Sequence, residues 1–321
     1  MSASMLFLDG GAVASRLDRR VLIDALDDAF RKPHTVPARQ HYSLKTGPLG
    51  QHAGTLLVMP AWNAGRSIGV KLVTVFPDNA LQSLPSVCAS YVLMDRGTGQ
   101  PRAFLDGTEI TLRRTAAASA LASRYLSAPE SSHLLMVGTG NLAPHLIHSH
   151  VLVRPITQVR IWGRHLDRAK ALATSLQRTG LAVDCTDDLE AATRWADIVS
   201  CATLSRQPLV RGAWLQPGQH LDLVGAFTPQ MCEVDDDALA RCEIYVDTRS
   251  GAVSESGEIV GAIARGIIQE SALRAEFRDL PAGSFRRSTR QAITLFKSVG
   301  TALEDLVAAE LVVGAGGPPS G

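Results

Sequence analysis

The stretch His133-Leu134-Leu135-Met136-Val137-Gly138-Thr139-Gly140-Asn141-Leu142-Ala143 decides the fold. Its apolar beginning runs directly into a G-x-G-x-x-A turn, and a helical pattern follows. Gly138 allows the tight turn, Gly140 lets bare backbone approach a diphosphate, and Ala143 lets helix and strand pack closely. The pattern therefore predicts a dinucleotide-binding turn whose helix N-terminus meets the anion; the alternative is a strand, turn and helix that bind no nucleotide. Further cofactor contacts expected in this turn are Thr139, Asn141 and Leu142.

The end of the next strand indicates which dinucleotide binds. Residues 158–162 form a second apolar strand, and a ribose-reading residue is expected roughly 20 residues after the turn. In proteins that bind NAD(H), an Asp or Glu at the tip of this strand usually accepts a hydrogen bond from the ribose 2′-hydroxyl. This chain has Gly163-Arg164-His165 there. Arg164 offers a fork of donors to a 2′-phosphate, so the sequence favours NADP(H), with NAD(H) as the second option. The alternative is a solvated Arg164, with Asp167 and Arg168 beginning the next helix.

Composition is that of an ordinary soluble globular protein. The 321 residues are 45% hydrophobic and 20% charged, and this length has room for two domains. Thirty-two Lys and Arg residues against thirty-one Asp and Glu residues leave a formal charge of +1. With so little net charge, we expect neither nucleic acid nor a membrane as a partner.

Cysteine usage and the chain start predict a cytoplasmic location. The five cysteines contain no C-x-x-C pair, which argues against a disulfide framework and a zinc site, and no other metal is expected. Residues 1–9 have no basic start and end on an acid, unlike a secretion signal. No apolar run approaches the length of a membrane span.

Hydrophobic periodicity gives the order of the elements. An amphipathic helix is predicted over 15–31, a loop of hairpin type over 95–100, and an Ala-rich helix over 111–126. A last helical pattern covers 290–309, and the Gly, Ala, Pro and Ser tail 314–321 is expected to be disordered. Short apolar runs that predict an antiparallel sheet are 54–59, 68–76, 86–94 and 101–105. Strands that alternate with helices, and so predict a doubly wound parallel sheet, are 133–137, 158–162, 181–185, 196–202 and 219–224.

Two basic residues stand where fold reasoning does not place them. Lys71 interrupts the apolar strand 68–76, and Arg114 lies near the start of the Ala-rich helix. Each has an ordinary explanation: Lys71 as an edge-strand lysine that faces water, and Arg114 as a helix arginine whose stem covers apolar surface.

Several motifs together resemble the ornithine cyclodeaminase/mu-crystallin family, from about residue 5 to residue 310. They are Gly69-Val70-Lys71, Asp106-Gly107-Thr108 with Leu112-Arg113-Arg114-Thr115-Ala116-Ala117-Ala118-Ser119, Val137-Gly138-Thr139-Gly140, Val224-Gly225-Ala226-Phe227-Thr228-Pro229, and Phe296-Lys297-Ser298-Val299-Gly300 with Asp305.

The resemblance implies an α/β fold in which a Rossmann-type parallel sheet is inserted into a second α+β domain. That second domain, for substrate binding and dimerisation, is expected over 1–113 and is completed by a C-terminal helix over 301–313. The dinucleotide-binding domain is expected over 114–300. The resemblance also implies a homodimer.

The resemblance also implies roles for the basic residues. Arg39 and Arg114 are expected to hold a substrate carboxylate, and Lys71 to lie beside the reacting carbon–nitrogen bond. Arginine's planar fork can fix a carboxylate at two points, and a lysine whose pKa falls near other cations suits proton exchange with an imine nitrogen. Cofactor contacts implied in the same way are Thr115, Thr203, Val224, Gly225, Lys297, Ser298 and Gly300.

One departure from the family pattern decides between its activities. Ornithine cyclodeaminases carry an aspartate two residues after the Val-Gly pair, where this chain has Phe227, expected as a substrate contact. A ring cannot stabilise a distal ammonium, which favours an apolar cyclic substrate. Glu233 or Asp235 is a possible replacement acid, although the acids at 233–237 are more typical of a helix start.

The leading hypothesis is an NAD(P)H-dependent ketimine reductase. It would reduce a small cyclic 2-carboxy imine, such as 1-pyrroline-2-carboxylate or 1-piperideine-2-carboxylate, to an L-imino acid such as L-proline. The alternatives are an ornithine cyclodeaminase, an enzyme like alanine dehydrogenase, and a ligand-binding protein like mu-crystallin.

Overall fold

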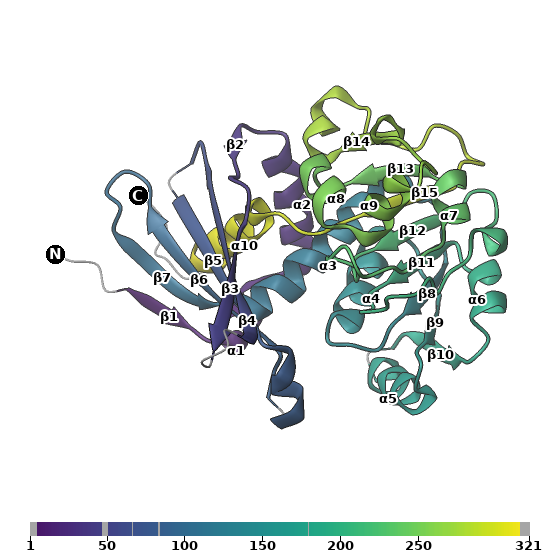
Figure 1. The fold of residues 1–321 in the computed structure, drawn as a ribbon, viewed down its shortest axis with the longest axis horizontal. Coiled ribbons are helices and arrows are strands. Elements are labelled where there is room, and N and C mark those ends of the chain that lie inside the picture. The colour runs from purple at the N-terminus through teal and green to yellow at the C-terminus, as the bar shows by residue number, and fades with distance from the viewer. Residues whose placement is uncertain (1–4, 47–50, 66, 83, 179, 315–321) are drawn as a thin grey trace. The chain divides into compact units, whose positions relative to one another are not determined.

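The structure is a computed structural model that describes residues 5–46, 51–65, 67–82, 84–178 and 180–314 (Figure 1). The chain divides into two compact units: unit 1 is Met1–Arg114 with Thr301–Gly321, and unit 2 is Thr115–Gly300. Unit 2 is thus an insertion in the sequence of unit 1. The substrate-binding and dimerisation role of unit 1 stays a prediction.

Unit 1 is built on a mixed sheet. Its hydrogen-bonded order is β1-β7-β6-β5-β4-β2, with β3 on β4; β1 runs parallel to β7 and the other pairs are antiparallel. The predicted antiparallel runs are therefore confirmed, as is the hairpin between β6 and β7. The strands are β1 (Leu6–Leu8), β2 (His34–Thr35), β3 (Gln40–Thr46), β4 (Gln51–Asn63), β5 (Ser67–Val75), β6 (Val87–Asp95) and β7 (Pro101–Asp106).

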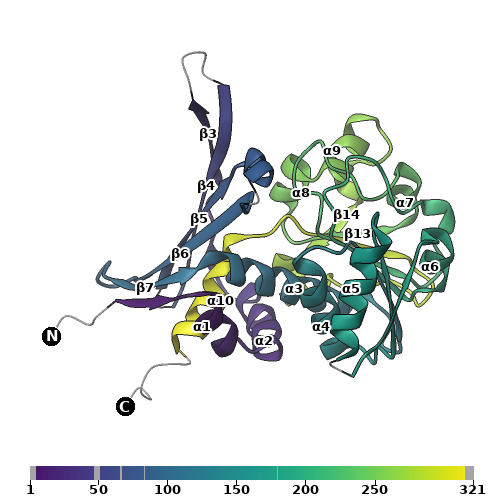
Figure 2. The same cartoon turned by 90° about the horizontal axis from the view of Figure 1, so that it is seen from below.

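Helices cover one face of this sheet. Helix α10 (Ala302–Gly314) packs on β5, β4 and α2 (Arg19–Phe30), and Figure 2 shows it, in yellow, beside these strands. The predicted amphipathic helix over 15–31 is confirmed as α2, but its start is wrong: α1 (Gly10–Arg16) ends first, and Asp18 then accepts a hydrogen bond from the Val21 amide and caps α2. Gly314 belongs to α10, and the rest of the predicted tail lies outside the described residues.

Unit 2 is a parallel sheet in the order β10-β9-β8-β11-β12-β15-β13-β14. This confirms the Rossmann-type prediction, and the strands predicted from the sequence lie within two residues of β8 to β12. Strands β13 and β14 were not predicted. The strands are β8 (His133–Val137), β9 (Gln158–Trp162), β10 (Ala182–Thr186), β11 (Ile198–Cys201), β12 (His220–Leu223), β13 (Glu243–Val246), β14 (Leu273–Glu276) and β15 (Thr294–Lys297).

Two apolar cores lie on the two faces of this sheet. In β8, Leu135 and Val137 join one core, and Leu134 and Met136 join the other. Such strands are apolar on both faces because helices cover both. The helices are α3 (Gly107–Leu126), which begins in unit 1, α4 (Leu142–Val153), α5 (Leu166–Gln177), α6 (Leu189–Trp195), α7 (Asp236–Arg241), α8 (Arg249–Glu255) and α9 (Gly257–Ala264).

The predicted helix over 290–309 is wrong in its first half. Residues Thr294–Lys297 form β15, which pairs with β12 on one side and β13 on the other. All four are buried, and a short, fully buried strand has no alternation that separates it from a helix segment. Gly300 then adopts φ +84°, and α10 begins at Ala302.

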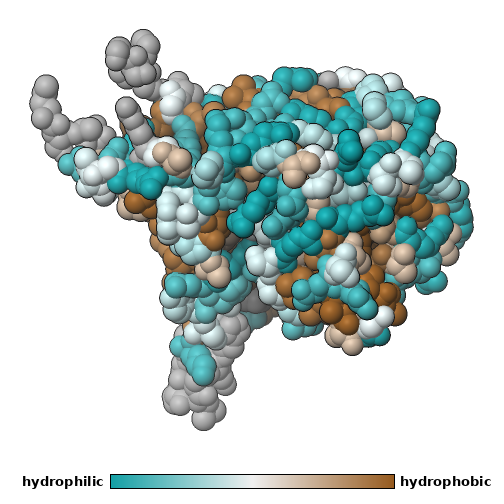
Figure 3. All heavy atoms as spheres, turned by 90° about the horizontal axis from the view of Figure 1, so that it is seen from above, coloured by the Kyte–Doolittle hydropathy of each residue, from teal (hydrophilic) through white to brown (hydrophobic). Residues whose placement is uncertain are grey.

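Hydrophilic and apolar side chains share the face drawn in Figure 3. Within the described residues, no helix combines the length and the apolar character that crossing a membrane requires.

Candidate active site

Lys71 is buried in the middle of unit 1. Strand β5 lies between β4 and β6, where Lys71 pairs with Met59 and Tyr91. Its side chain is 2% exposed, and its Nζ lies 2.7 Å from Oδ2 of Asp305 on α10. The alternative of a water-facing edge lysine is therefore wrong. A buried ammonium needs such a partner, because desolvation penalises an unpaired charge heavily.

Arg114 approaches the same carboxylate from α3. Its Nε lies 3.0 Å from Oδ1 of Asp305, and its Nη1 lies 2.6 Å from Oε2 of Glu304. The guanidinium is buried with both acids, so more than its stem is in the interior. Asp305 thus bridges Lys71 and Arg114.

The surroundings lower the pKa of Lys71 to about 8. Burial is the main cause, and the positive charge of Arg114 is the second; Asp305 opposes both, and Arg39 lowers the pKa further. Arg39, half-buried just before β3, is therefore close enough for its charge to act on Lys71. Of the three cations predicted to bind substrate, Lys71 and Arg114 thus meet at Asp305 in unit 1, and the charge of Arg39 reaches Lys71.

The Gly69-Val70-Lys71 motif has a packing reason for its glycine. A Cβ on Gly69 would lie 1.8 Å from the hydroxyl oxygen of Tyr91, which is fully buried on the neighbouring strand. Any larger residue at position 69 would displace the aromatic ring that pairs with Lys71.

The dinucleotide turn of unit 2 has the geometry that its sequence predicts. Gly138 has φ +124°, and a Cβ there would lie 2.5 Å from the Ala202 carbonyl oxygen. At Gly140 a Cβ would meet nothing within 4 Å, so this side of the turn is open. Asn141 precedes α4 but makes no side-chain cap. The Asn141 side chain therefore does not cap the first backbone amides of α4. Anion binding at this helix N-terminus requires those amides to be free of such a cap.

Arg164 is exposed beside this turn. It follows Gly163, where a Cβ would lie 2.7 Å from the Thr139 side chain, so any larger residue would have to displace that side chain. The chain therefore places an exposed, charged side chain directly after the residue that contacts Thr139, although the contact with a 2′-phosphate stays a prediction.

Glu233 joins the loops after β11 and β12. Its fully buried carboxylate accepts hydrogen bonds from the Thr203 amide at 2.7 Å, the Thr203 hydroxyl at 2.9 Å and the Gly225 amide at 2.8 Å. Gly225 has no space for a side chain, because its Cβ would lie 2.2 Å from the Thr203 backbone. The predicted helix start is therefore correct for Asp235, which caps α7, and wrong for Glu233.

Hydrogen bonds to Asp247 fix the segment that follows β15. Asp247 accepts hydrogen bonds from the Ser298 hydroxyl at 2.9 Å and from the Gly300 amide at 2.6 Å. The Lys297 side chain points inward, fully buried, with its Nζ 3.3 Å from Oε2 of Glu258. A cofactor contact of Lys297 would thus come from its backbone.

The remaining predicted residues differ in exposure. Thr115 and Val224 are each 8% exposed, whereas Phe227 is 38% exposed on the loop after β12. In the part of the chain that the structure describes, no group of three or more His, Cys, Asp or Glu side chains is placed to hold a metal ion.

Comparison with known proteins settles the family. The sequence model of the ornithine cyclodeaminase/mu-crystallin family matches residues 7–315. The chain belongs to this family. The Delta(1)-pyrroline-2-carboxylate reductase of Paracoccus denitrificans is 37% identical to it over 313 residues, covering 97% of both proteins.

Solved structures of related enzymes share the whole fold. The Delta(1)-pyrroline-2-carboxylate reductase of Thermococcus litoralis, in complex with NADH and L-proline, has a TM-score of 0.91 at 31% identity and 97% coverage of both chains. An archaeal alanine dehydrogenase dimer with bound NAD has a TM-score of 0.89 at 29% identity, covering 97% of this chain and 95% of that one.

Sequence reasoning missed two residues of the cluster around Lys71 and Arg114 in this family member. Glu304 binds Arg114, and Thr111 lies with its hydroxyl oxygen 3.4 Å from the Lys71 ammonium. A signal was present: Glu304 and Asp305 are adjacent acids in a helix whose other residues, apart from Glu310, are apolar or glycine. Acids at buried helical positions need cationic partners, which Lys71 and Arg114 supply.

Proposed function

We propose that this protein is an NAD(P)H-dependent reductase of a small cyclic 2-carboxy imine, which it converts to an L-imino acid. 1-Pyrroline-2-carboxylate, giving L-proline, and 1-piperideine-2-carboxylate are the substrates considered. The observation that carries the proposal is the buried Lys71, with its pKa near 8, which Asp305 bridges to Arg114. The relative solved with NADH and L-proline supports the same chemistry.

The three cations would have two different roles, substrate binding and proton donation. Arg39 and Arg114 would bind the substrate carboxylate and fix the face of the neighbouring carbon. Lys71 is mostly protonated at pH 7 with a pKa near 8, and would donate a proton to the imine nitrogen. When bound, the reduced nicotinamide supplies the hydride that C2 accepts; with the proton from Lys71 on nitrogen, the C=N bond becomes a secondary amine.

The cofactor would lie on the Gly138 turn, with its pyrophosphate at the start of α4. We propose NADP(H) as the preferred form, because exposed Arg164 offers a cation where an Asp or Glu would repel a 2′-phosphate. The related structures that contain NADH and NAD make NAD(H) the second option.

Phe227 argues against ornithine cyclodeamination. Its half-exposed ring cannot stabilise a distal ammonium. The candidate replacements are engaged elsewhere: Glu233 by Thr203 and Gly225, and Asp235 as the cap of α7.

We also propose a homodimer formed through the face of the unit 1 sheet opposite to Lys71. Strand register places Phe7, Phe104 and Leu72 on that face, and they are 71%, 38% and 37% exposed. Such an apolar sheet face is typical of an interaction surface. The dimeric archaeal relative supports a second copy of the chain as the partner.

The direct test of the function is NADPH oxidation with a panel of cyclic imines and keto acids, with and without ammonia. Turnover of cyclic imines without ammonia supports the proposal. Keto acid turnover that requires ammonia would instead show an enzyme like alanine dehydrogenase. Ammonia release from L-ornithine with catalytic NAD would show a cyclodeaminase, and binding without turnover would show a ligand-binding protein.

A further inference from the structure

The loops that follow β11 and β12 lie on the far side of the dinucleotide turn from Arg164. The hydrogen-bonded order in this part of the sheet is β9-β8-β11-β12, with Arg164 after β9 and the Gly138 turn after β8. A dinucleotide bound to such a sheet lies across the carboxyl ends of its strands. With the pyrophosphate on the turn and the adenosine ribose at Arg164, the nicotinamide half would extend over the loops after β11 and β12.

These two loops touch each other, and one of them touches the turn. A Cβ on Gly225 would lie 2.2 Å from both the amide nitrogen and the carbonyl oxygen of Thr203, so the two backbones pack with no side chain between them. A Cβ on Gly138 would lie 2.5 Å from the Ala202 carbonyl oxygen. A shift of either loop would therefore change the surface beside the turn.

Glu233 fixes both loops from the interior of unit 2. Its Oε1 accepts hydrogen bonds from the Thr203 amide at 2.7 Å and the Thr203 hydroxyl at 2.9 Å, and its Oε2 accepts one from the Gly225 amide at 2.8 Å. The residue is fully buried, so three protein donors take the place of the water that would solvate an exposed carboxylate.

A second buried acid holds Glu233 itself. Oε1 of Glu258, on α9, accepts a hydrogen bond from the Glu233 amide at 3.0 Å, and its Oε2 lies 3.3 Å from the Nζ of Lys297. Lys297 ends β15, the strand next to β12. Burial raises the pKa of Glu233, and the positive charge of Lys297 opposes that rise. The three residues thus connect the carboxyl ends of β11, β12 and β15.

Given the proposed NAD(P)H-dependent function, we propose that Glu233 is a positioning residue for the nicotinamide half of the cofactor. It acts through the backbones of Thr203 and Gly225, which it holds in one arrangement before the cofactor binds. A carboxylate suits this role because both of its oxygens accept hydrogen bonds. Glutamine would turn one acceptor into a donor, so the amide of Thr203 or Gly225 would face an NH₂ group.

Two ligands that differ in the nicotinamide half test this role, by calorimetric titration of the whole protein. NADPH has that half, whereas 2′-phospho-ADP-ribose has the same pyrophosphate and adenosine 2′-phosphate but no nicotinamide. NADH and ADP-ribose are titrated as a second pair, and the pair that binds more tightly is used. The variant is Glu233→Gln.

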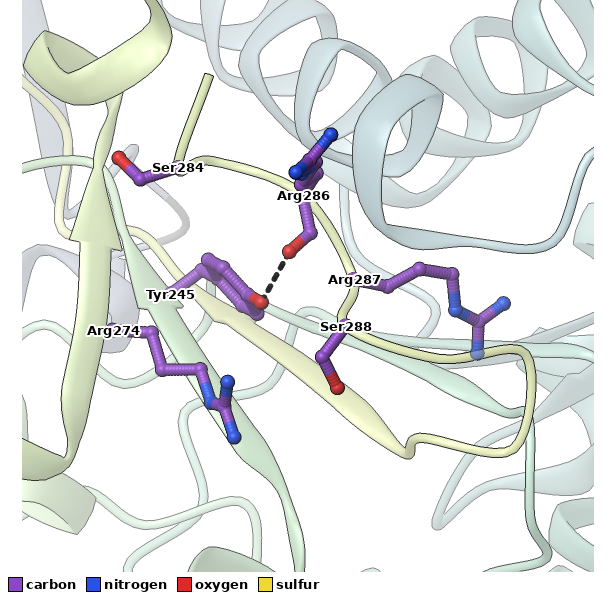
Figure 4. A pocket seen from close by; sticks show the side chains of 6 residues that line it. All are labelled: Tyr245, Arg274, Ser284, Arg286, Arg287 and Ser288. Carbon is purple, nitrogen blue, oxygen red and sulfur yellow. Dashed lines mark hydrogen bonds between the residues drawn. The ribbon is translucent and has the colours of Figure 1, made fainter. Parts of the chain in front are cut away.

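Glu243→Gln is the matched control, because it makes the same change in a partly buried acid of the same unit. Glu243 begins β13, at the amino end of the sheet, and accepts a hydrogen bond from the Ser288 amide at 3.0 Å. Ser288 lines a hollow whose three arginine side chains point apart, as Figure 4 shows. The cofactor loops follow the opposite ends of the strands.

We expect Glu233→Gln to bind NADPH about tenfold more weakly than wild type, because a buried amide loses its acceptor, and to bind 2′-phospho-ADP-ribose as tightly as wild type. Glu243→Gln should bind both ligands as wild type does. An equal loss for the two ligands would show a general structural role and overturn the proposal, as would unchanged affinity for NADPH.

Thr203→Val is a second test, which does not depend on the folding of Glu233→Gln. It removes the hydroxyl donor to Glu233 and keeps the amide, so we expect a smaller loss of about threefold, again confined to NADPH. A wild type that binds neither NADPH nor NADH would overturn this role and the proposed function together. A selective loss in a protein that reduces no imine would reject the proposed function alone, because the readout is binding.

Discussion

At the scale of single residues, the decisive feature is the buried cluster of Lys71, Asp305 and Arg114. Taking one partner from a buried ion pair costs about 3–5 kcal/mol, because the other charge is left unpaired. The cluster therefore holds its cations in place, while burial, and after it the charge of Arg114, lowers the pKa of Lys71. The same arrangement that stabilises unit 1 thus prepares a proton donor.

The pH dependence of kcat/KM tests this role. Lys71 must be protonated to donate, so we expect kcat/KM to fall about tenfold per pH unit above pH 8. Asp305 raises the pKa of Lys71, so Asp305→Asn should move this fall to lower pH. Glu304→Gln is the control, because Glu304 pairs with Arg114. An unmoved profile in Asp305→Asn would show that Lys71 is not the titrating group.

Arg164 tests the choice of cofactor. We expect Arg164→Ala to raise KM for NADPH roughly tenfold or more, since a charge-assisted hydrogen bond is lost, and to leave KM for NADH unchanged. Arg168→Ala, on the exposed first turn of α5, should change neither. Wild-type protein that prefers NADH would contradict the assignment.

At the scale of elements, the strand, turn and helix from His133 onward could be predicted because this glycine pattern is specific to one turn geometry. Strand β15 was predicted as helix because a fully buried four-residue strand has no periodicity that distinguishes it from helix. Strands β13 and β14, each four residues long, were not predicted. Lys71 was noticed because its charge interrupts an apolar strand. Its partners are far away in the chain, and no local pattern links Lys71 with Thr111, or Arg114 with Glu304.

The two glycines of the turn should respond differently to alanine. Gly138→Ala places a side chain 2.5 Å from the Ala202 carbonyl at positive φ, and should destabilise the protein by about 1–3 kcal/mol or more. Gly140→Ala meets nothing within 4 Å, so its free energy of unfolding should stay the same or rise by up to about 1 kcal/mol.

Cofactor affinity completes this test. Gly140→Ala should bind NADPH much more weakly than wild type, because its methyl group points into the open side of the turn where backbone meets the diphosphate. Urea unfolding and cofactor fluorescence measure the two effects separately. A Gly140→Ala protein with full affinity would mean that the diphosphate does not lie on this turn.

At the scale of the whole molecule, one chain builds a unit that carries the cations and inserts within it a unit that carries the dinucleotide turn. The family resemblance predicted this order, since composition and periodicity give elements but not which segments pack together. The long sequence separation between Lys71 and Asp305 follows from it, because α10 returns to β5 only after the inserted unit is complete.

The proposed dimer belongs to this scale. Phe104→Lys puts a charge on the apolar face of the unit 1 sheet, so we expect it to shift the protein toward the monomer in light scattering at micromolar concentration. Leu81→Lys, at an 86% exposed side chain of the same unit, is the control. A wild-type monomer, or a Phe104→Lys protein that associates as tightly as wild type, would reject this interface.

The most direct test of the central claim is the rate of NADPH oxidation with 1-pyrroline-2-carboxylate, without ammonia, in wild type and Lys71→Met. We expect wild type to form L-proline, and Lys71→Met to lose at least about 100-fold in kcat, as removal of a general acid does, while its affinity for NADPH is unchanged. Equal turnover in the two proteins would remove Lys71 from the mechanism, and turnover that requires ammonia would contradict imine reduction itself.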